Sequence, residues 1–181
     1  MEIKRVAIAC MLALCACAAS AAEGDGGVAL LLEGGAAGTG RYIASVGLAW
    51  PWSWRRAVEG GEWTGVTELF VSHLSSRVEG GRESRTLVGL LPLVRYRFNG
   101  AHSNWFGEAG IGLTYMDALY RTENKQFSTQ FNFMSTLGVG RSFGAKREQE
   151  LSLRIVHISN AGIKNPNPGE NFLQLRWSHA L

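Results

Sequence analysis

His157 and Ser159 are the two residues of this sequence whose types and spacing most directly indicate covalent chemistry. A serine hydroxyl becomes an effective nucleophile when a neighbouring base accepts its proton. On a β-strand, residues i and i+2 share one face at a Cα separation of roughly 7 Å, which leaning side chains can close. Glu170 follows beyond a loop and is the carboxylate expected to orient the imidazole. The pattern predicts an acyl-transfer centre with His157 as base, Ser159 as nucleophile and Glu170 as the acid.

Hydrogen-bond donors that would stabilise a tetrahedral oxyanion follow directly after the serine. The Asn160 side-chain amide and the backbone N–H groups around Ala161 and Gly162 are expected to provide them. No His, Asp or Glu cluster in residues 157–172 has metal-ligand spacing, so the predicted chemistry uses no metal and no cofactor.

Residues 160–170 form a structured loop between two strands, because turn-forming residues are dense there. They are Asn160, Gly162, Asn165, Pro166, Asn167, Pro168 and Gly169. From the residues alone, Asn167 is expected to be an Asn-Pro turn former.

Alternation of apolar and polar residues with a period of two predicts the strands that position this loop. It is clear from Arg41 onward, near residues 105–115, in 131–143, and in the segments Gln149–Ser159 and Asn171–Leu181. Noisier strands are expected near residues 28–35, 63–73 and 84–98. About eight strands in an all-β chain predict an eight-stranded antiparallel transmembrane β-barrel.

Along the predicted strands, charged residues and many glycines alternate with the apolar residues, so they lie on the opposite face. The charged residues are Glu33, Glu68, Glu108, Arg95, Arg97, Arg154 and Arg176. A soluble sandwich or lipocalin-like barrel would instead place the apolar parity in its core. The mixed charges favour an enclosed polar lumen in which acids and bases pair.

Residues 1–22 have the features of a secretory signal peptide, namely Lys4 and Arg5, an apolar run and small residues before Glu23. The barrel domain then comprises residues 23–181. All three cysteines lie in the leader, which leaves the mature chain without a thiol. Lipoprotein processing at Cys17 is the alternative. With 18 basic and 15 acidic residues, the chain shows no charge bias toward nucleic acid.

Parity places His157 and Ser159 on the apolar face of their strand, with Leu151, Leu153 and Ile155. Both polar side chains would therefore face lipid or lipid head groups, which is costly and suggests function. If both termini are periplasmic, the loop at residues 160–170 is extracellular and lies at the outer leaflet.

The stretch HISNAGIKNPNPGENF resembles the signature of the lipid A 3-O-deacylase (PagL) family of outer-membrane enzymes. The resemblance implies a triad of His157, Ser159 and Glu170 that hydrolyses the 3-position acyl ester of lipid A and releases a 3-hydroxy fatty acid. It also implies lipopolysaccharide as substrate, an outer-membrane location, no metal, and a place for Asn167 near the site. The family's glutamate lies one residue further from the histidine, where this chain has Asn171.

Strand parity likewise puts Asn171 rather than Glu170 on the outer face, unless Pro168 and Gly169 bend the chain. Two other functions remain open from the sequence: a structural or adhesin-like barrel without catalysis, and a barrel phospholipase or acyltransferase. The residues also leave open whether the protein acts alone or as a homodimer, and which acyl chain it prefers.

Overall fold

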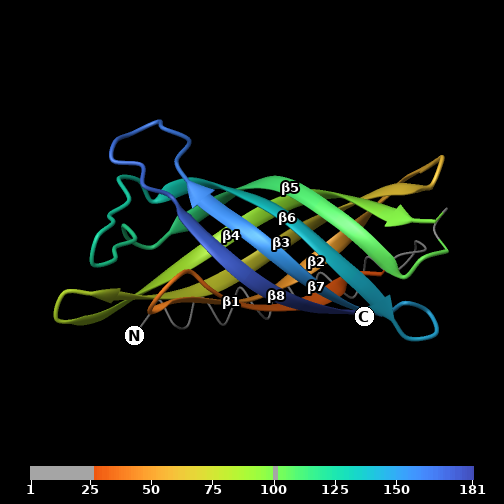
Figure 1. Cartoon of the computed structure of the whole chain (residues 1–181), viewed down its shortest axis with the longest axis horizontal. Coiled ribbons are helices and arrows are strands. Elements are labelled where there is room, and N and C mark those ends of the chain that lie inside the picture. The colour runs from red at the N-terminus through yellow and green to blue at the C-terminus, as the bar shows by residue number, and fades with distance from the viewer. Residues whose placement is uncertain (1–26, 100–101) are drawn as a thin grey trace.

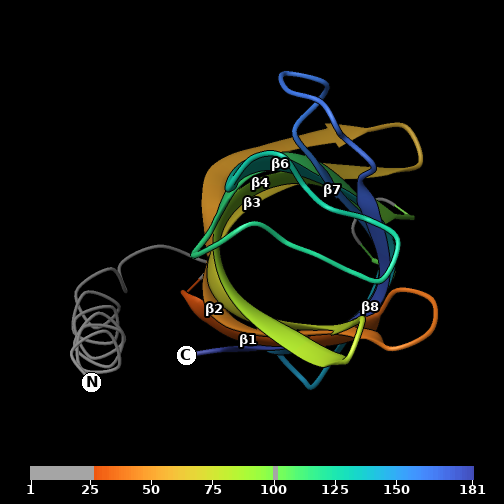
Figure 2. The same ribbon diagram turned by 90° about the vertical axis from the view of Figure 1, so that its left-hand side faces the viewer.

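Eight antiparallel strands form a closed ring in the computed structural model, which describes residues 27–99 and 102–181 (Figures 1 and 2). They are β1 (Ala29–Ala36), β2 (Arg41–Val58), β3 (Gly61–Val78), β4 (Gly81–Phe98), β5 (Trp105–Met116), β6 (Phe131–Phe143), β7 (Gln149–Ser159) and β8 (Glu170–Ala180). Each strand pairs with its neighbours in sequence, and β1 closes the barrel against β8. The predicted all-β barrel is confirmed. The predicted signal peptide lies outside the described residues.

The outer surface is apolar over the middle of the strands. On β7, for example, Leu151, Leu153 and Ile155 are exposed, while Ser152 and Arg154 between them are buried. This is the reverse of a soluble barrel and is the arrangement expected where lipid surrounds the strands. Within the described ranges, no helix is long and apolar enough to cross a membrane.

Paired charges occupy the middle of the lumen, and buried apolar side chains such as Leu31, Phe70 and Leu91 fill much of the rest. Arg154 is at its centre, with its guanidinium 2.7 Å from Glu33, 2.8 Å from Glu68 and 2.6 Å from Glu108. These side chains come from four different strands, so their ion pairs tie opposite walls of the barrel together. The predicted pairing of lumen charges is confirmed, and a barrel of this size filled by side chains leaves no wide channel.

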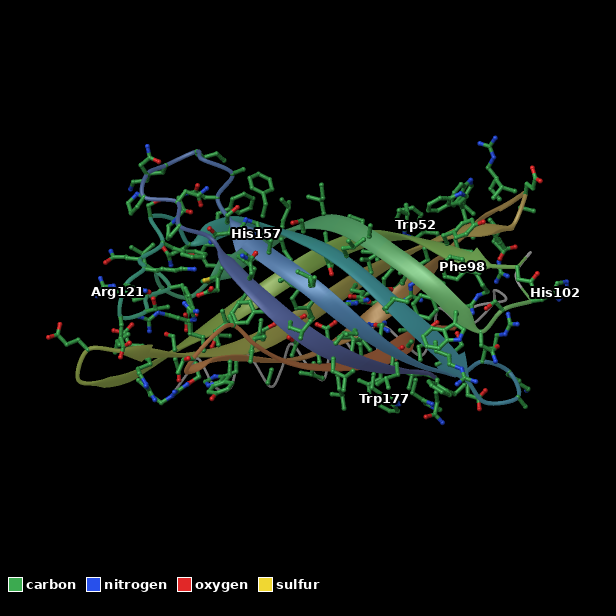
Figure 3. All side chains as sticks on the ribbon, in the orientation of Figure 1. Trp52, Phe98, His102, Arg121, His157 and Trp177 are labelled. Carbon is green, nitrogen blue, oxygen red and sulfur yellow. The ribbon has the colours of Figure 1, made fainter. Side chains whose placement is uncertain are left out.

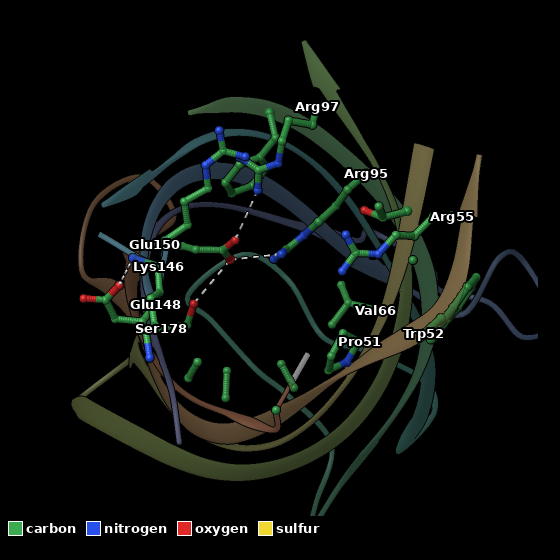
Figure 4. A pocket seen from close by; sticks show the side chains of 18 of the residues that line it. Pro51, Trp52, Arg55, Val66, Arg95, Arg97, Lys146, Glu148, Glu150 and Ser178 are labelled. Atoms are coloured by element: carbon green, nitrogen blue, oxygen red, sulfur yellow. Dashed lines mark hydrogen bonds and ion pairs between the residues drawn. The ribbon is translucent and has the colours of Figure 1, made fainter. Parts of the chain in front are cut away.

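A cavity of about 650 Å³ opens at the end of the lumen where Gly27 and Leu181 lie. Figure 4 shows Glu150 there, joined to Arg95, Arg97 and Ser178. Glu150 is thus shared between several arginines, in a mouth lined by many charged side chains.

The opposite end, called here the loop end, carries the two long connections, residues 117–130 and 160–169 (Figure 1). The loop at 117–130 crosses the barrel mouth (Figure 2). Tyr120 and Phe127 turn inward from it, are buried, and pack edge to face. The two loops are joined by the Ser128 hydroxyl, which donates to the Lys164 carbonyl at 2.8 Å. The two joined loops therefore fix the ends of β7 and β8 where His157 and Ser159 lie.

Candidate active site

His157 and Ser159 both lie on the outer face of β7, as their parity predicts. Figure 3 shows His157 on the outside of the barrel near the loop end. Both side chains are half-buried, in contrast to the exposed Ile155 that precedes them on the same face. Neighbouring residues therefore shield the pair partly from its surroundings while leaving it accessible from outside the barrel.

Asn171 is the residue behind the histidine. Strands β7 and β8 pair with His157 opposite Asn171, and the Asn171 Oδ1 atom lies 2.7 Å from His157 Nδ1. Because an amide oxygen only accepts hydrogen bonds, Nδ1 carries the proton. The other ring nitrogen, Nε2, is then the basic atom, and it is the nitrogen that a serine nucleophile requires.

Glu170 points into the barrel, so the expectation that it lies behind His157 is not met. It is the first residue of β8, and strand parity turns its side chain to the lumen, where it is 3% exposed. Its carboxylate lies 3.3 Å from Arg41 and 3.1 Å from Lys125, and it accepts a hydrogen bond from the Tyr120 hydroxyl at 3.4 Å. Burial and this carboxylate raise the pKa of Tyr120. Two cations and a phenol thus hold Glu170 on the face opposite to His157.

Gly169 lies against the imidazole of His157. The prediction that Gly169 is a turn former did not include this contact. Its φ is +58°, and a Cβ atom placed on it would lie 2.7 Å from His157 Cε1. Lys125 Nζ donates to the Gly169 carbonyl at 3.1 Å. The glycine backbone therefore forms one wall of the histidine site, and the loop at 117–130 holds that wall in place.

The Asn160 side chain is hydrogen-bonded within the loops. The prediction that it faces the site is therefore not met. It is 2% exposed, and its Nδ2 group donates to Ser128 Oγ at 2.9 Å and to the Lys164 carbonyl at 2.7 Å. Its Oδ1 atom accepts from the Gly162 N–H at 2.9 Å. With both amide hydrogens and the oxygen engaged, Asn160 fixes the shape of the turn.

Asn167 is held against the turn that follows Ser159. Its Oδ1 atom accepts a hydrogen bond of 3.0 Å from the backbone N–H of Asn160, the residue that follows Ser159. That bond anchors the Asn167 amide and leaves its Nδ2 group to donate elsewhere.

Comparison with known proteins decides between the open alternatives. Residues 40–180 match the family model described as lipid A 3-O-deacylase (PagL). The chain belongs to this family. Membership confirms the predicted resemblance and the prediction of an ester hydrolase, and it argues against a barrel without catalysis.

Two relatives in the PagL family share much of this sequence. The chain is 31% identical over 138 residues to lipid A deacylase PagL of Pseudomonas aeruginosa, covering 75% of this chain and 76% of that protein. It is 38% identical over 72 residues to the PagL of Bordetella bronchiseptica, covering 40% and 39%. A crystal structure of the outer membrane enzyme PagL superposes with a TM-score of 0.73 at 25% identity, covering 84% of this chain and 99% of that one. The predicted outer-membrane barrel agrees with that structure.

No group of three or more His, Cys, Asp or Glu side chains that would hold a metal ion occurs in the described part of this PagL-family chain. His157 and Asn171 are hydrogen-bonded to one another, and Ser159 lies on the same face of β7 as His157.

Proposed function

We propose that this protein hydrolyses the ester at the 3 position of lipid A and releases a 3-hydroxy fatty acid, with Ser159 as nucleophile and His157 as base. The observation that carries the proposal is the orientation of His157. Asn171 binds its Nδ1 atom on the lipid-facing surface, in a chain of the PagL family, and Ser159 shares that surface. Lipid A and lipopolysaccharide present their acyl esters at this depth of a membrane.

In the first half-reaction, Ser159 Oγ attacks the ester carbonyl carbon while His157 Nε2 accepts the hydroxyl proton. The tetrahedral intermediate collapses, and the sugar oxygen leaves with the proton from His157. A water molecule then attacks the acyl-enzyme with His157 again as base. The second collapse returns the proton to Ser159 Oγ and frees the fatty acid, so that one water is consumed for each ester cleaved.

Asn171 serves in this scheme as a neutral third member. Its Oδ1 atom selects the tautomer with a proton on Nδ1 and fixes the plane of the ring. A cysteine–histidine–asparagine arrangement is known in papain-like proteases, so a neutral partner is compatible with acyl transfer. An amide stabilises the transient imidazolium less than a carboxylate does.

The oxyanion is stabilised by donors from the turn that follows Ser159. Asn167 Nδ2 is the side-chain candidate, since the Asn167 amide is anchored beside the residue after the nucleophile. The backbone N–H of Ala161, a residue held at a φ of +52°, is the main-chain candidate. Preorganised donors of this kind act on the charge that develops in the transition state.

The loop end faces the outer leaflet in this proposal, so that His157 and Ser159 meet the glucosamine backbone while the acyl chains extend down the barrel wall. The apolar residues below the pair on β7, Ile155 and Leu153, are exposed and suit contact with those chains.

Product analysis tests the proposal. The protein, refolded in detergent, is incubated with purified lipid A and a phospholipid, and both the lipids and free fatty acids are analysed by mass spectrometry. The expected result is lipid A lacking one 3-hydroxyacyl group at position 3, with an equal amount of 3-hydroxy fatty acid. An acyl chain transferred to a second lipid, lysophospholipid as the main product, or no product from folded protein would each contradict it.

A further inference from the structure

Two arginines face each other across the β3–β4 hairpin, on the outer face of the barrel. Arg77 of β3 pairs directly with Arg82 of β4, and both side chains are exposed. The hairpin is at the loop end, on the side of the barrel opposite to the loop at 160–169 (Figures 1 and 2). In the ring of strands, β3 is four strands away from β7 in either direction. This arginine pair is therefore separate from the proposed catalytic site.

The arginine pair is electrostatically unfavourable by itself. Directly opposite residues in an antiparallel pair have Cβ atoms roughly 5 Å apart, and like charges in such positions destabilise the sheet. Within residues 27–99 and 102–181, neither Arg77 nor Arg82 takes part in an ion pair, and Glu79 in the adjoining turn does not bridge them. Arg154 in the lumen, by contrast, binds three glutamates. An anion from outside the chain would offset the repulsion between Arg77 and Arg82.

Neutral groups hold both arginines in place. The Nε and Nη2 atoms of Arg82 donate to the Ser75 hydroxyl at 3.1 and 2.9 Å. The Arg82 guanidinium also lies over the Tyr42 ring, 5.3 Å from its centroid. Arg77 leans toward the same part of β2, because a Cβ atom placed on Gly40 would lie 3.4 Å from Arg77 Nε. Two positive charges are thus directed to the start of β2, where one anion can contact both.

The position of the pair along β4 indicates which anion it meets. The outer face of β4 is apolar at Val88 and Leu90, both 46% exposed, and becomes polar from Thr86 toward the hairpin. Arg82 is four residues beyond Thr86, roughly 13 Å along a tilted strand, and so lies above the hydrocarbon layer. With the loop end in the outer leaflet, this level contains the phosphate groups of lipopolysaccharide. Guanidinium groups match phosphate oxygens in charge and in geometry.

We infer that Arg77 and Arg82 bind the phosphate of a lipopolysaccharide molecule that is not the substrate, on the wall of the barrel across from Ser159. The inference uses the orientation given under the proposed function but does not use its chemistry. The bound lipid offsets the repulsion between the two arginines and fixes the β3–β4 hairpin in the outer leaflet.

Lipid binding is measured in a Ser159→Ala background, so that no lipid is consumed. The refolded barrel is titrated with lipid A, the phosphate-bearing part of lipopolysaccharide, and native mass spectrometry gives the dissociation constant of each bound lipid. In Arg82→Gln, one of these constants should rise about tenfold, the effect of losing a hydrogen bond to a charged group. Arg82→Lys keeps the charge and should show a smaller rise. Heat-modifiable gel mobility confirms that each variant is folded.

Arg121→Gln is the matched control, because Arg121 is an exposed arginine at the same end of the barrel (Figure 3) and lies outside the pair. Its constants should equal those of the parent. Lipid A without phosphate groups should bind parent and Arg82→Gln equally.

Three results would overturn the inference: equal lipid A binding by parent and Arg82→Gln, an equal loss in Arg121→Gln, or displacement of the lipid by an equal concentration of inorganic phosphate. The last result would assign the pair to free phosphate. Failure of the proposed function is seen separately, because the folded wild type would then release no fatty acid while this binding comparison remained readable.

Discussion

The contact between Asn171 Oδ1 and His157 Nδ1, at 2.7 Å, sets which ring nitrogen is basic in this site. The departure from the family signature noted in the sequence, an asparagine where the glutamate is expected, therefore falls on a residue that touches the histidine. The chemical consequence is a third member that orients the ring without a negative charge.

Substitutions of Asn171 should separate orientation from charge. Asn171→Ala removes the acceptor for Nδ1, so kcat should fall at least about tenfold, equivalent to roughly 1.4 kcal/mol in the barrier. Asn171→Asp keeps the shape and adds a carboxylate that stabilises the imidazolium, so kcat should rise above the wild-type value. Rates on purified lipid A in detergent measure both. An aspartate variant as slow as the alanine variant would refute this role.

A substitution at Gly169 tests whether the position of the His157 imidazole determines the rate. Gly169→Ala puts a methyl group 2.7 Å from His157 Cε1, which forces the imidazole to move. We expect kcat to fall by about tenfold or more, because misplacement of a base by an ångström is costly. Gly80→Ala is the control, since Gly80 has a similarly positive φ of +81° but open space around it. Equal losses in both variants would show that backbone strain, rather than the histidine contact, is responsible.

At the scale of elements, the start of β8 determines what Glu170 and Asn171 do. Their side chains lie on opposite faces of one strand, so the ion cluster on the inner face and the histidine contact on the outer face fix each other's position. Lys125 reinforces this by binding both Glu170 and the Gly169 carbonyl. Glu170 is thus a positioning residue, which holds the strand that presents Asn171.

Glu170→Gln should accordingly affect stability more than chemistry. Arg41 and Lys125 would lose a shared partner, but both are partly exposed, at 19% and 27%. Solvent screening reduces the cost, and we expect the free energy of unfolding to fall by about 1–3 kcal/mol. Urea unfolding in detergent and hydrolysis rates are measured together. A normal unfolding midpoint with abolished hydrolysis would instead give Glu170 a chemical role.

Strand periodicity was sufficient to predict the barrel, the charged lumen and the outward face of His157 and Ser159. The choice between Glu170 and Asn171 depended on the residue at which β8 begins, and the dense turn formers before it obscured that boundary. The orientation of the Asn160 side chain depended on Ser128 and Lys164, which lie in different loops and come together only in the folded chain.

At the scale of the whole molecule, the barrel combines an apolar outer surface with an interior that holds both a buried ion network and a cluster of buried apolar side chains. Arg154, 1% exposed, binds three glutamates at once and links walls of the barrel that are far apart in sequence. The outer surface is then free to present the site directly to lipid.

Arg154→Met tests this arrangement. It would leave Glu33, Glu68 and Glu108 buried without their central cation, and the loss of one partner from a buried ion network costs about 3–5 kcal/mol. We expect the urea midpoint to fall sharply, or the barrel to fail to refold, as judged by heat-modifiable gel mobility. A wild-type midpoint would show that the lumen network does not stabilise the barrel.

The central claim is that a lipid-facing serine on β7 attacks the ester. The most direct test compares Ser159→Ala with Ser84→Ala, which removes an exposed serine from the outer face of β4 at the same end. Each variant is refolded, checked by heat-modifiable mobility and incubated with lipid A, and released 3-hydroxy fatty acid is quantified by mass spectrometry. The account predicts no release above background from Ser159→Ala and wild-type release from Ser84→Ala. Wild-type release from a folded Ser159→Ala barrel would contradict it.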